Sequence, residues 1–258
     1  MNPAVHVEID GHSATVEQLS AAAPAGYGHF TAMQVRNGRV RGLGLHLARL
    51  DAANREMFGA GLDTATVLGY IRHALSGQAS DASVRVYVYE APGGPAVMVT
   101  VRPPGTMAPD VWRLQTVPYQ RSLAHIKHIG DFGQGYYGRL ARSNGFDEAL
   151  LTGPDGIVCE GSITNIGFSD GTGVLWPDAP ALAGVTMQIV ARGLAERGVP
   201  SRCAPVRVSG LGSFAGAFVT NSHGIAPVGQ VDGRTLPVDD ALMSAVTQAY
   251  ESAGWDQI

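Results

Sequence analysis

The stretch KHIGDFGQGYYGRLARSNGFDEALLTGPDGIVCEGSITN, residues 127–165, contains the features on which the interpretation of the whole chain depends. It begins at Lys127, continues through a helix-like run, and ends in two strand-like pieces joined by the tetrapeptide GPDG at 153–156. Proline fixes φ and glycine accepts positive φ, so this tetrapeptide suits a tight turn. The stretch therefore predicts a helix followed by a hairpin, with Lys127 at one end and Glu160 at the other.

Lys127 and Glu160 are of the two residue types that a pyridoxal-phosphate site needs most. A lysine amine forms a Schiff base with a carbonyl, and a carboxylate keeps a pyridine nitrogen protonated. Taken alone the pair carries little weight, because most lysines are solvated and a glutamate beside a turn is usually only polar. The spacing of the two residues and the sequence between them are more specific.

The segments GFDEALL at 145–151 and GIVCEGSITN at 156–165 follow Lys127 in an order that closely resembles the core of the class IV pyridoxal-phosphate enzymes. That family comprises the fold-type-IV branched-chain and D-amino-acid aminotransferases and aminodeoxychorismate lyase. The resemblance implies that Lys127 carries pyridoxal 5′-phosphate as a Schiff base. It also implies that Glu160 contacts the pyridine nitrogen.

The same resemblance, which extends over about 28–228, implies an α/β (α+β) fold of type IV. A small α+β N-terminal lobe over 1–103 would be joined by a linker at 104–110 to a C-terminal pseudo-barrel lobe over 111–258, which binds the cofactor. The consecutive prolines at 103 and 104 and the glycine at 105, where this linker starts, cannot continue a sheet. The family resemblance further implies a homodimer.

Composition describes an ordinary globular protein and excludes several classes. The 258 residues are 45% hydrophobic and 16% charged, with a net charge of −4, so no basic footprint for nucleic acid is present. No apolar run reaches the ~20 residues of a membrane helix, and the N-terminus lacks the features of a signal peptide. With Cys159 and Cys203 as the only cysteines and no metal-spaced cluster, we expect a cytoplasmic protein without a bound metal.

The N-terminal part predicts a strand, a hairpin and a helix. GHFTAMQV at 28–35 alternates like a strand, and Asn37-Gly38 favours a type I′ turn. HLARL at 46–50 opens a helix with apolar residues at helical spacing. GHFTA, NGR and HLARL together resemble the N-terminal signature of the family, in which the arginine, here Arg49, reaches the cofactor phosphate; a planar guanidinium suits that task.

The strand expected at 83–89, SVRVYVY, is the part of the chain where we look for substrate-binding residues. Its valines face one way, whereas Arg85 and Tyr87 face the other. In the family this region handles the substrate, so Phe30, Arg85 and Tyr87 become the candidate substrate-binding residues. For Arg85 and the tyrosines, a structural role on a half-solvated face is an equally open interpretation.

Two further segments are candidates for holding the phosphate. LAGVT at 182–186 opens a predicted helix that runs to about Arg197, and a helix N-terminus offers unpaired amides to an anion. VTNSHGIAPV at 219–228 resembles the late strand and loop of the family. The candidate cofactor-binding residues from these two segments are Val185, Thr186, Asn221 and Ser222.

Phe132 marks a departure from the family. Branched-chain enzymes have a tyrosine five residues after the lysine, where this chain has Phe132. The residue that would replace its hydrogen bond to the cofactor hydroxyl is left open. This departure argues against a plain branched-chain aminotransferase.

The sequence therefore predicts a pyridoxal-phosphate-dependent aminotransferase that moves an amino group between an amino acid or amine and a 2-oxo acid through a Lys127 Schiff base. A lyase of the aminodeoxychorismate type, which releases pyruvate, is the main alternative. A class IV scaffold without catalysis is the third interpretation. The donor, the acceptor and the stereochemistry do not follow from the sequence.

Overall fold

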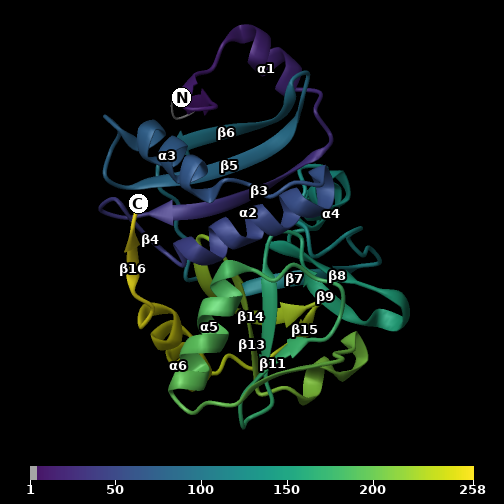
Figure 1. Ribbon diagram of the computed structural model, residues 1–258. Coiled ribbons are helices and arrows are strands. Elements are labelled where there is room, and N and C mark those ends of the chain that lie inside the picture. The colour runs from purple at the N-terminus through teal and green to yellow at the C-terminus, as the bar shows by residue number, and fades with distance from the viewer. Residues whose placement is uncertain (1–4) are drawn as a thin grey trace. The chain divides into compact units, whose positions relative to one another are not determined.

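The computed structural model describes residues 5–258 and divides into two compact units (Figure 1). Unit 1 comprises the described residues up to Gly105, together with Ile126–Gly130 and Gly254–Ile258. Unit 2 comprises Thr106–His125 and Asp131–Ala253. Lys127 thus belongs to unit 1, although the segments before and after Ile126–Gly130 belong to unit 2. The lobe boundaries expected around 104–110 stay a prediction.

Unit 1 is built on an antiparallel five-stranded sheet with two long helices. The strands follow the order β2-β1-β6-β5-β3. A separate two-stranded pair joins β4 to β16, so the last residues of the chain are tied to the N-terminal part. The elements are β1 (His6–Ile9), β2 (His12–Ser13), α1 (Val16–Ala22), β3 (Gly28–Val35), β4 (Arg39–Arg41), α2 (Leu43–Phe58), α3 (Thr64–Leu75), β5 (Ala82–Ala91), β6 (Gly94–Arg102) and β16 (Trp255–Gln257).

Helices α2 and α3 cover one face of this sheet, as Figure 1 shows. Alternation in β5 puts Val84, Val86 and Val88 into that core, where they meet Leu50 of α2 and Ile71 of α3. The predicted division of β5 into a valine face and a polar face is confirmed. The second face of the sheet carries Phe30, Arg85 and Tyr87 and remains half-buried.

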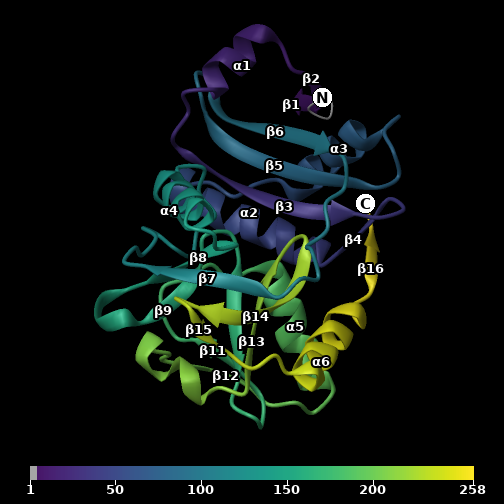
Figure 2. The same ribbon diagram turned by 180° about the vertical axis from the view of Figure 1, so that it is seen from behind.

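Unit 2 is built on a curled nine-stranded mixed sheet, seen from behind in Figure 2. The order is β12-β11-β10-β13-β14-β7-β8-β9, with β15 paired to β14; the pairs β11–β12, β14–β7 and β7–β8 are parallel. The elements are β7 (Trp112–Val117), α4 (Phe132–Ser143), β8 (Glu148–Thr152), β9 (Val158–Gly161), β10 (Asn165–Ser169), β11 (Val174–Pro177), α5 (Val185–Glu196), β12 (Ser201–Ala204), β13 (Gly216–Asn221), β14 (Gly224–Val231), β15 (Arg234–Thr235) and α6 (Asp240–Glu251).

The helices of unit 2 pack at two places on the sheet. Val190 and Leu194 of α5 share a core with Val246 of α6 and Phe218 of β13. Ala141 of α4 packs with residues of β7 and β8 in a smaller core. Pro154–Gly156 forms a short 3₁₀ turn between β8 and β9, where the sequence predicts a tight turn.

The mixed α/β fold predicted from the sequence is confirmed. Two helix starts were wrong. The helix expected to open at His46 begins at Leu43. The helix expected to open at Leu182 begins at Val185, because Leu182–Gly184 stays outside the helix as its entry. Helix α1 was not predicted at all. Among the helices of residues 5–258, none combines the length and the apolar character needed to cross a membrane.

Candidate active site

The segment that carries Lys127 runs alongside the first residues of β3. The amide of Phe30 donates to the carbonyl of Lys127 over 2.8 Å, and the amide of Ile129 donates to the carbonyl of Gly28 over 3.0 Å. These two bonds fix the backbone at the lysine and just after it. Its half-buried side chain places Nζ 4.8 Å from the centre of the Phe30 ring.

Lys127 is the only lysine in the sequence. The chain has 18 Lys and Arg residues, and all the others are arginines. Arginine carries the same charge but does not act as an amine nucleophile, because its guanidinium stays protonated. A lysine at this one position indicates a need for the amine itself.

The candidate substrate residues of unit 1 lie together next to Lys127. The rings of Phe30 and Tyr87 stack with centroids 5.2 Å apart, and the two residues face each other across β3 and β5. Nη1 of Arg85 donates to the hydroxyl of Tyr87 over 3.4 Å. Unit 1 therefore brings an amine, an aromatic wall, a phenol and a guanidinium onto one face of its sheet.

Arg49 lies on the α2 side of β3. Its guanidinium donates to Oγ1 of Thr31, which is also 2.7 Å from Nδ1 of His46. Thr31 and Phe30 are neighbours in a strand, so their side chains point to opposite faces. Burial, with Arg49 as a second cause, lowers the pKa of His46 to about 3, so this histidine is a neutral packing residue.

Glu160 is buried in unit 2 near the end of β9, with a donor on each oxygen. Nε of Arg121 donates to Oε1 over 3.0 Å, and the amide of Leu182 donates to Oε2 over 3.0 Å. The guanidinium of Arg121 also donates to the carbonyl of Ala124. Each carboxylate oxygen has two lone pairs, so Glu160 retains capacity to accept a further hydrogen bond.

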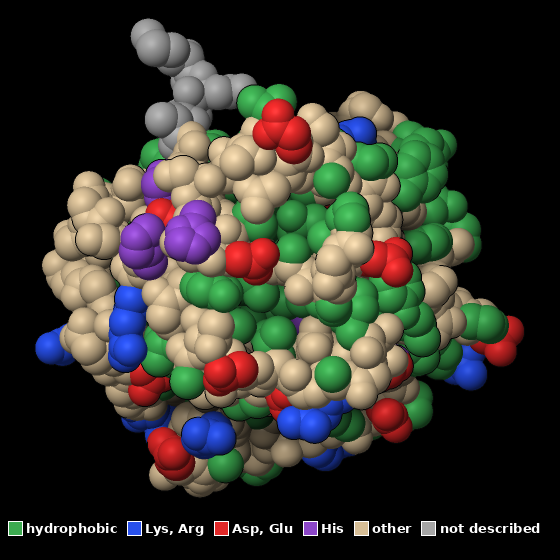
Figure 3. Space-filling view, turned by 45° about the horizontal axis from the view of Figure 1, so that its top comes forward, with side chains coloured by type: hydrophobic (Ala, Val, Ile, Leu, Met, Phe, Trp, Pro, Cys, Tyr) green, Lys and Arg blue, Asp and Glu red, His purple; other side chains and the backbone are tan. Residues whose placement is uncertain are grey.

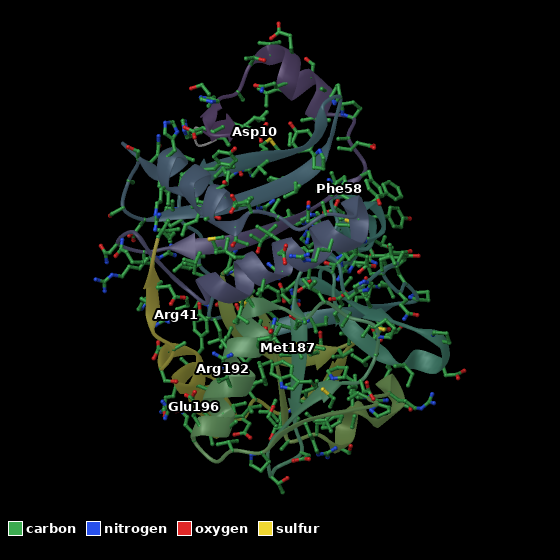
Figure 4. The ribbon with its side chains drawn as sticks, viewed as in Figure 1. Asp10, Arg41, Phe58, Met187, Arg192 and Glu196 are labelled. Carbon is green, nitrogen blue, oxygen red and sulfur yellow. The ribbon has the colours of Figure 1, made fainter. Side chains whose placement is uncertain are left out.

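The start of α5 is joined to Glu160 through the segment that enters the helix. Nδ2 of Asn165 donates to the carbonyl of Leu182 over 2.7 Å, and a Cβ on Gly184 would collide with Oδ1 of Asn165. Gly184 is the N-cap and no side chain caps the helix. In Figure 4, Met187 marks the first turn of α5, while Arg192 and Glu196 mark its later turns. The first amides of this helix are thus left for another acceptor.

Thr186 connects the start of α5 with the end of β13. Its hydroxyl donates to the carbonyl of Asn221 over 2.8 Å. The side chain of Asn221 in turn accepts from the amide of His223, which shapes the turn that contains Ser222. Unit 2 therefore brings Glu160, Val185, Thr186, Asn221 and Ser222 into one hydrogen-bonded region.

The residues of unit 2 fit a phosphorylated pyridine. An uncapped helix start suits a phosphate through its amides and its dipole. The buried hydroxyl of Thr220, next to Asn221, has no hydrogen-bond partner among the described residues. A buried carboxylate such as Glu160 suits a ring N–H.

Glu148 holds the turn that follows Glu160. Its buried carboxylate accepts from the hydroxyl of Ser162 at 3.1 Å, the hydroxyl of Thr164 at 2.9 Å and the amide of Ile163. Burial raises the pKa of Glu148 to about 7, although these hydrogen bonds act to lower it. The turn between β9 and β10 is therefore anchored from β8.

Sequence reasoning missed Arg121 and Glu148 as parts of this region. Arg121 precedes Lys127 in an irregular segment, and only its burial beside Glu160 distinguishes it from a solvated arginine. Glu148 was interpreted only as part of the GFDEALL segment. Glu148 begins the strand EALLT, whose next three residues are apolar, and an acidic residue at such a position could have indicated a buried, hydrogen-bonded carboxylate.

A second polar cluster lies on β1 and α3 of unit 1. Figure 3 shows histidine side chains gathered around a carboxylate on one face of the molecule. A carboxylate oxygen of Glu8 is 3.0 Å from Nε2 of His6, and the other is 2.8 Å from Nδ1 of His73. Burial of Glu8 acts to raise its pKa, but the two histidines lower it, and the pKa lies below its ordinary value. Over residues 5–258 no group of three or more His, Cys, Asp or Glu could hold a metal ion.

Known structures share this fold over almost the whole chain. The PLP-bound form of a hypothetical aminotransferase from Mycobacterium tuberculosis matches with a TM-score of 0.82 at 22% identity, covering 95% of this chain and 97% of that one. A branched-chain aminotransferase from Thermoproteus uzoniensis, solved with norvaline, matches with a TM-score of 0.81 at 21% identity, covering 95% and 93%. A putative 4-amino-4-deoxychorismate lyase from Legionella pneumophila matches with a TM-score of 0.77 at 16% identity, covering 86% and 89%.

The comparison with curated proteins gave no match. The model of the family described as amino-transferase class IV matches residues 28–231, which is most of the chain. The family resemblance seen in the sequence is thereby confirmed. The chain belongs to the class IV aminotransferase family.

Proposed function

We propose that this protein is a pyridoxal-phosphate-dependent aminotransferase that moves an amino group between an amino acid or amine and a 2-oxo acid. The observation that carries the proposal is the single lysine of the chain, Lys127, held by backbone hydrogen bonds beside Phe30. The hydrogen-bonded region around Glu160 and the start of α5 supports the same function.

Lys127 would hold the cofactor covalently at rest through Nζ. Once displaced, the same amine is the base that removes the proton from the substrate Cα. Bound pyridoxal phosphate supplies an aldehyde for the amino group and a ring that accepts the electrons of the broken bond. Glu160 would accept a hydrogen bond from the protonated ring nitrogen, with Arg121 balancing its charge inside the protein.

The phosphate would be bound by the amides of Val185 and Thr186, with Asn221 and Ser222 at its edge and Arg49 as its cation. Phe30, Arg85 and Tyr87 would receive the substrate, with Arg85 and Tyr87 as donors for a carboxylate. We propose that the protein acts as a homodimer. Its expected cytoplasmic location remains a prediction from composition.

Amino-group transfer tests this function directly. The purified protein, loaded with pyridoxal phosphate, is incubated with single amines or amino acids and with 2-oxoglutarate or pyruvate, and the new amino acid is measured. We expect transfer with at least one donor. Lys127→Ala should lower the rate by about 10²–10⁴-fold or more, because it removes the base. A loaded protein that stays inert with a broad donor panel would contradict the proposal.

The lyase alternative predicts a different product balance. A lyase releases pyruvate from aminodeoxychorismate without any amino acceptor, whereas an aminotransferase turns over repeatedly only when an acceptor is present. Measuring pyruvate with and without a 2-oxo acid separates these two reactions. The same lysine serves both, so Lys127→Ala does not distinguish them.

A further inference from the structure

Helix α2 and strand β3 of unit 1 lie side by side and share a buried polar contact (Figure 1). His46 and Arg49 of α2 are three residues apart, so their side chains lie on the same side of the helix. Both side chains reach Oγ1 of Thr31 in β3. Thr31 is completely buried, and His46 is 4% exposed. Three polar side chains thus meet in the interior of the unit.

The hydrogen bonds among these three side chains run in one direction. A guanidinium has five N–H donors and no acceptor, so Oγ1 of Thr31 accepts the hydrogen bond from Arg49. The hydroxyl has one hydrogen of its own, and Nδ1 of His46 lies 2.7 Å from Oγ1. When Nδ1 carries no proton, it accepts that hydrogen. Arg49 then donates to Thr31, and Thr31 donates to His46.

The charge of His46 decides whether this arrangement forms. A charged imidazolium carries a proton on both ring nitrogens, so Nδ1 would no longer accept from Thr31. It would also place a second positive charge beside Arg49. Burial, with Arg49 as a second cause, lowers the pKa of His46 to about 3, so the ring is neutral at neutral pH. With Nδ1 as the acceptor, the single ring proton lies on Nε2.

Thr100 shows the same residue type in the same sheet without such partners. It lies in β6 and is 5% exposed, and its hydroxyl has no hydrogen-bond partner among the described residues. The hydroxyl of Thr31, by contrast, is fixed in direction by two side chains of α2. The contact at Thr31 is therefore specific to this position and not a general property of buried threonines in the sheet.

A fixed orientation of Arg49 suits the role proposed for it above. An arginine side chain has several rotatable bonds, and its planar fork matches a phosphate only when it is correctly oriented. A hydrogen bond from a terminal nitrogen to a buried hydroxyl orients the whole planar group. A ligand that meets a group already oriented in this way loses less entropy on binding.

We infer that Thr31 and His46 are positioning residues for Arg49: Thr31 orients the guanidinium, and His46 orients the Thr31 hydroxyl. His46 therefore does more than pack in the first turns of α2. The inference rests on the proposed function, in which Arg49 is the cation for the cofactor phosphate. It assigns neither Thr31 nor His46 a contact with the cofactor, and every contact that it uses lies within unit 1.

Calorimetric titration with pyridoxamine 5′-phosphate and with pyridoxamine tests the inference without turnover. The two ligands differ only in the phosphate, and neither has an aldehyde that could react with Lys127. Thr31→Val and His46→Leu should each weaken binding of pyridoxamine 5′-phosphate by about tenfold and binding of pyridoxamine by less than about twofold. Thr31→Ser keeps the hydroxyl, and His46→Asn keeps an acceptor on Cγ, so both should stay within about threefold of the wild type.

Arg49→Met distinguishes a positioning role from a purely structural one. In that background Thr31→Val and His46→Leu should change binding of pyridoxamine 5′-phosphate by less than about twofold, because the group that they position is absent. Equal effects in the two backgrounds would overturn the inference. Thr100→Val is the matched control: it removes a buried hydroxyl without a described partner and should leave the affinity for both ligands unchanged.

The same titrations keep the inference apart from the proposed function. A wild type that binds both ligands equally, or an Arg49→Met variant that binds as the wild type does, would contradict the phosphate role of Arg49. Phosphate-dependent binding that both Thr31→Val and His46→Leu leave unchanged would overturn the inference alone. Thermal unfolding confirms that each variant is folded. The ratio of the two affinities is read out because a loss of folded protein affects both ligands equally.

Discussion

Within unit 2, the negative charge of Glu160 is balanced by one arginine, Arg121. Both side chains of the Arg121–Glu160 pair are buried, with 3.0 Å between Nε and Oε1. Removing one partner from a buried pair leaves the other charge without compensation, which is more costly than removing both. This pair therefore links the stability of unit 2 to the proposed cofactor site.

Arg121→Met should lower the free energy of unfolding by roughly 3–5 kcal/mol, because it leaves Glu160 charged and buried. The double variant Arg121→Met/Glu160→Gln should recover part of that loss. Arg113→Met is the matched control: its pair with Asp147 is exposed, so the change should stay below about 1 kcal/mol. Urea unfolding measures all four proteins. Equal effects of Arg121→Met and Arg113→Met would contradict the assigned role of the buried pair.

Glu148 makes the stability of the fold depend on pH. The pKa of this carboxyl is raised to about 7 in the folded protein from 4.5, so the folded state binds the proton more tightly than the unfolded state. Its contribution is fully present below pH 4.5 and is lost as the pH rises through about 7. Relative to Glu148→Gln, the wild type should lose roughly 3 kcal/mol over this interval.

Urea unfolding of wild type and Glu148→Gln at several pH values from about 4.5 to about 8 provides the comparison. The variant keeps the size of the side chain and cannot titrate there, so the difference between the two curves isolates Glu148. Parallel curves would show that the turn at 161–164 does not depend on this proton. Hydrogen exchange of the Ile163 amide provides a local measurement of the same event.

At the scale of elements, the start of α5 is the most constrained part of the proposed phosphate site. Gly184 must lack a Cβ because Asn165 occupies that space. Thr186 then ties the first turn to β13. The two contacts fix the direction in which the first amides of α5 point.

Gly184→Ala should displace the start of α5 and weaken binding of pyridoxal phosphate by about tenfold, while binding of pyridoxal without phosphate changes little. Gly69→Ala in α3 is the control: a Cβ there meets nothing within 4 Å, so it should stabilise the protein by up to about 1 kcal/mol. Titrations followed by absorbance measure both ligands. If the variant lost affinity equally for both ligands, the effect of Gly184 would not act through the phosphate.

Elements with strong local patterns were predictable. The alternation of β5 and the Asn37-Gly38 turn specify their structures within a few residues, and both are confirmed. Helix α1 was missed although Thr15 and Gln18 form a capping box at its start. The helix also contains no buried side chain, so no apolar face indicated it.

At the scale of the whole molecule, long-range pairings were beyond a single sequence. The parallel pairing of β7 with β14 joins segments that lie far apart in the chain, while the other edge of β7 pairs with β8. The Arg121–Glu160 pair spans 39 positions. The family resemblance identified Lys127 and Glu160 as candidates, but which side chains support them is decided by packing. The sequence also shows that the chain contains a single lysine. Sequence reasoning overlooked this fact, although it is the strongest indication of the role of Lys127.

The central claim is that Lys127 binds pyridoxal phosphate covalently. Incubation with the cofactor, reduction with borohydride and mass spectrometry of the whole chain and its peptides test it most directly, since no other lysine side chain is present to react. We predict one reduced adduct per chain, located on the peptide that contains Lys127 and missing in Lys127→Arg. A wild type without adduct, or an adduct that persists in Lys127→Arg, would contradict the account.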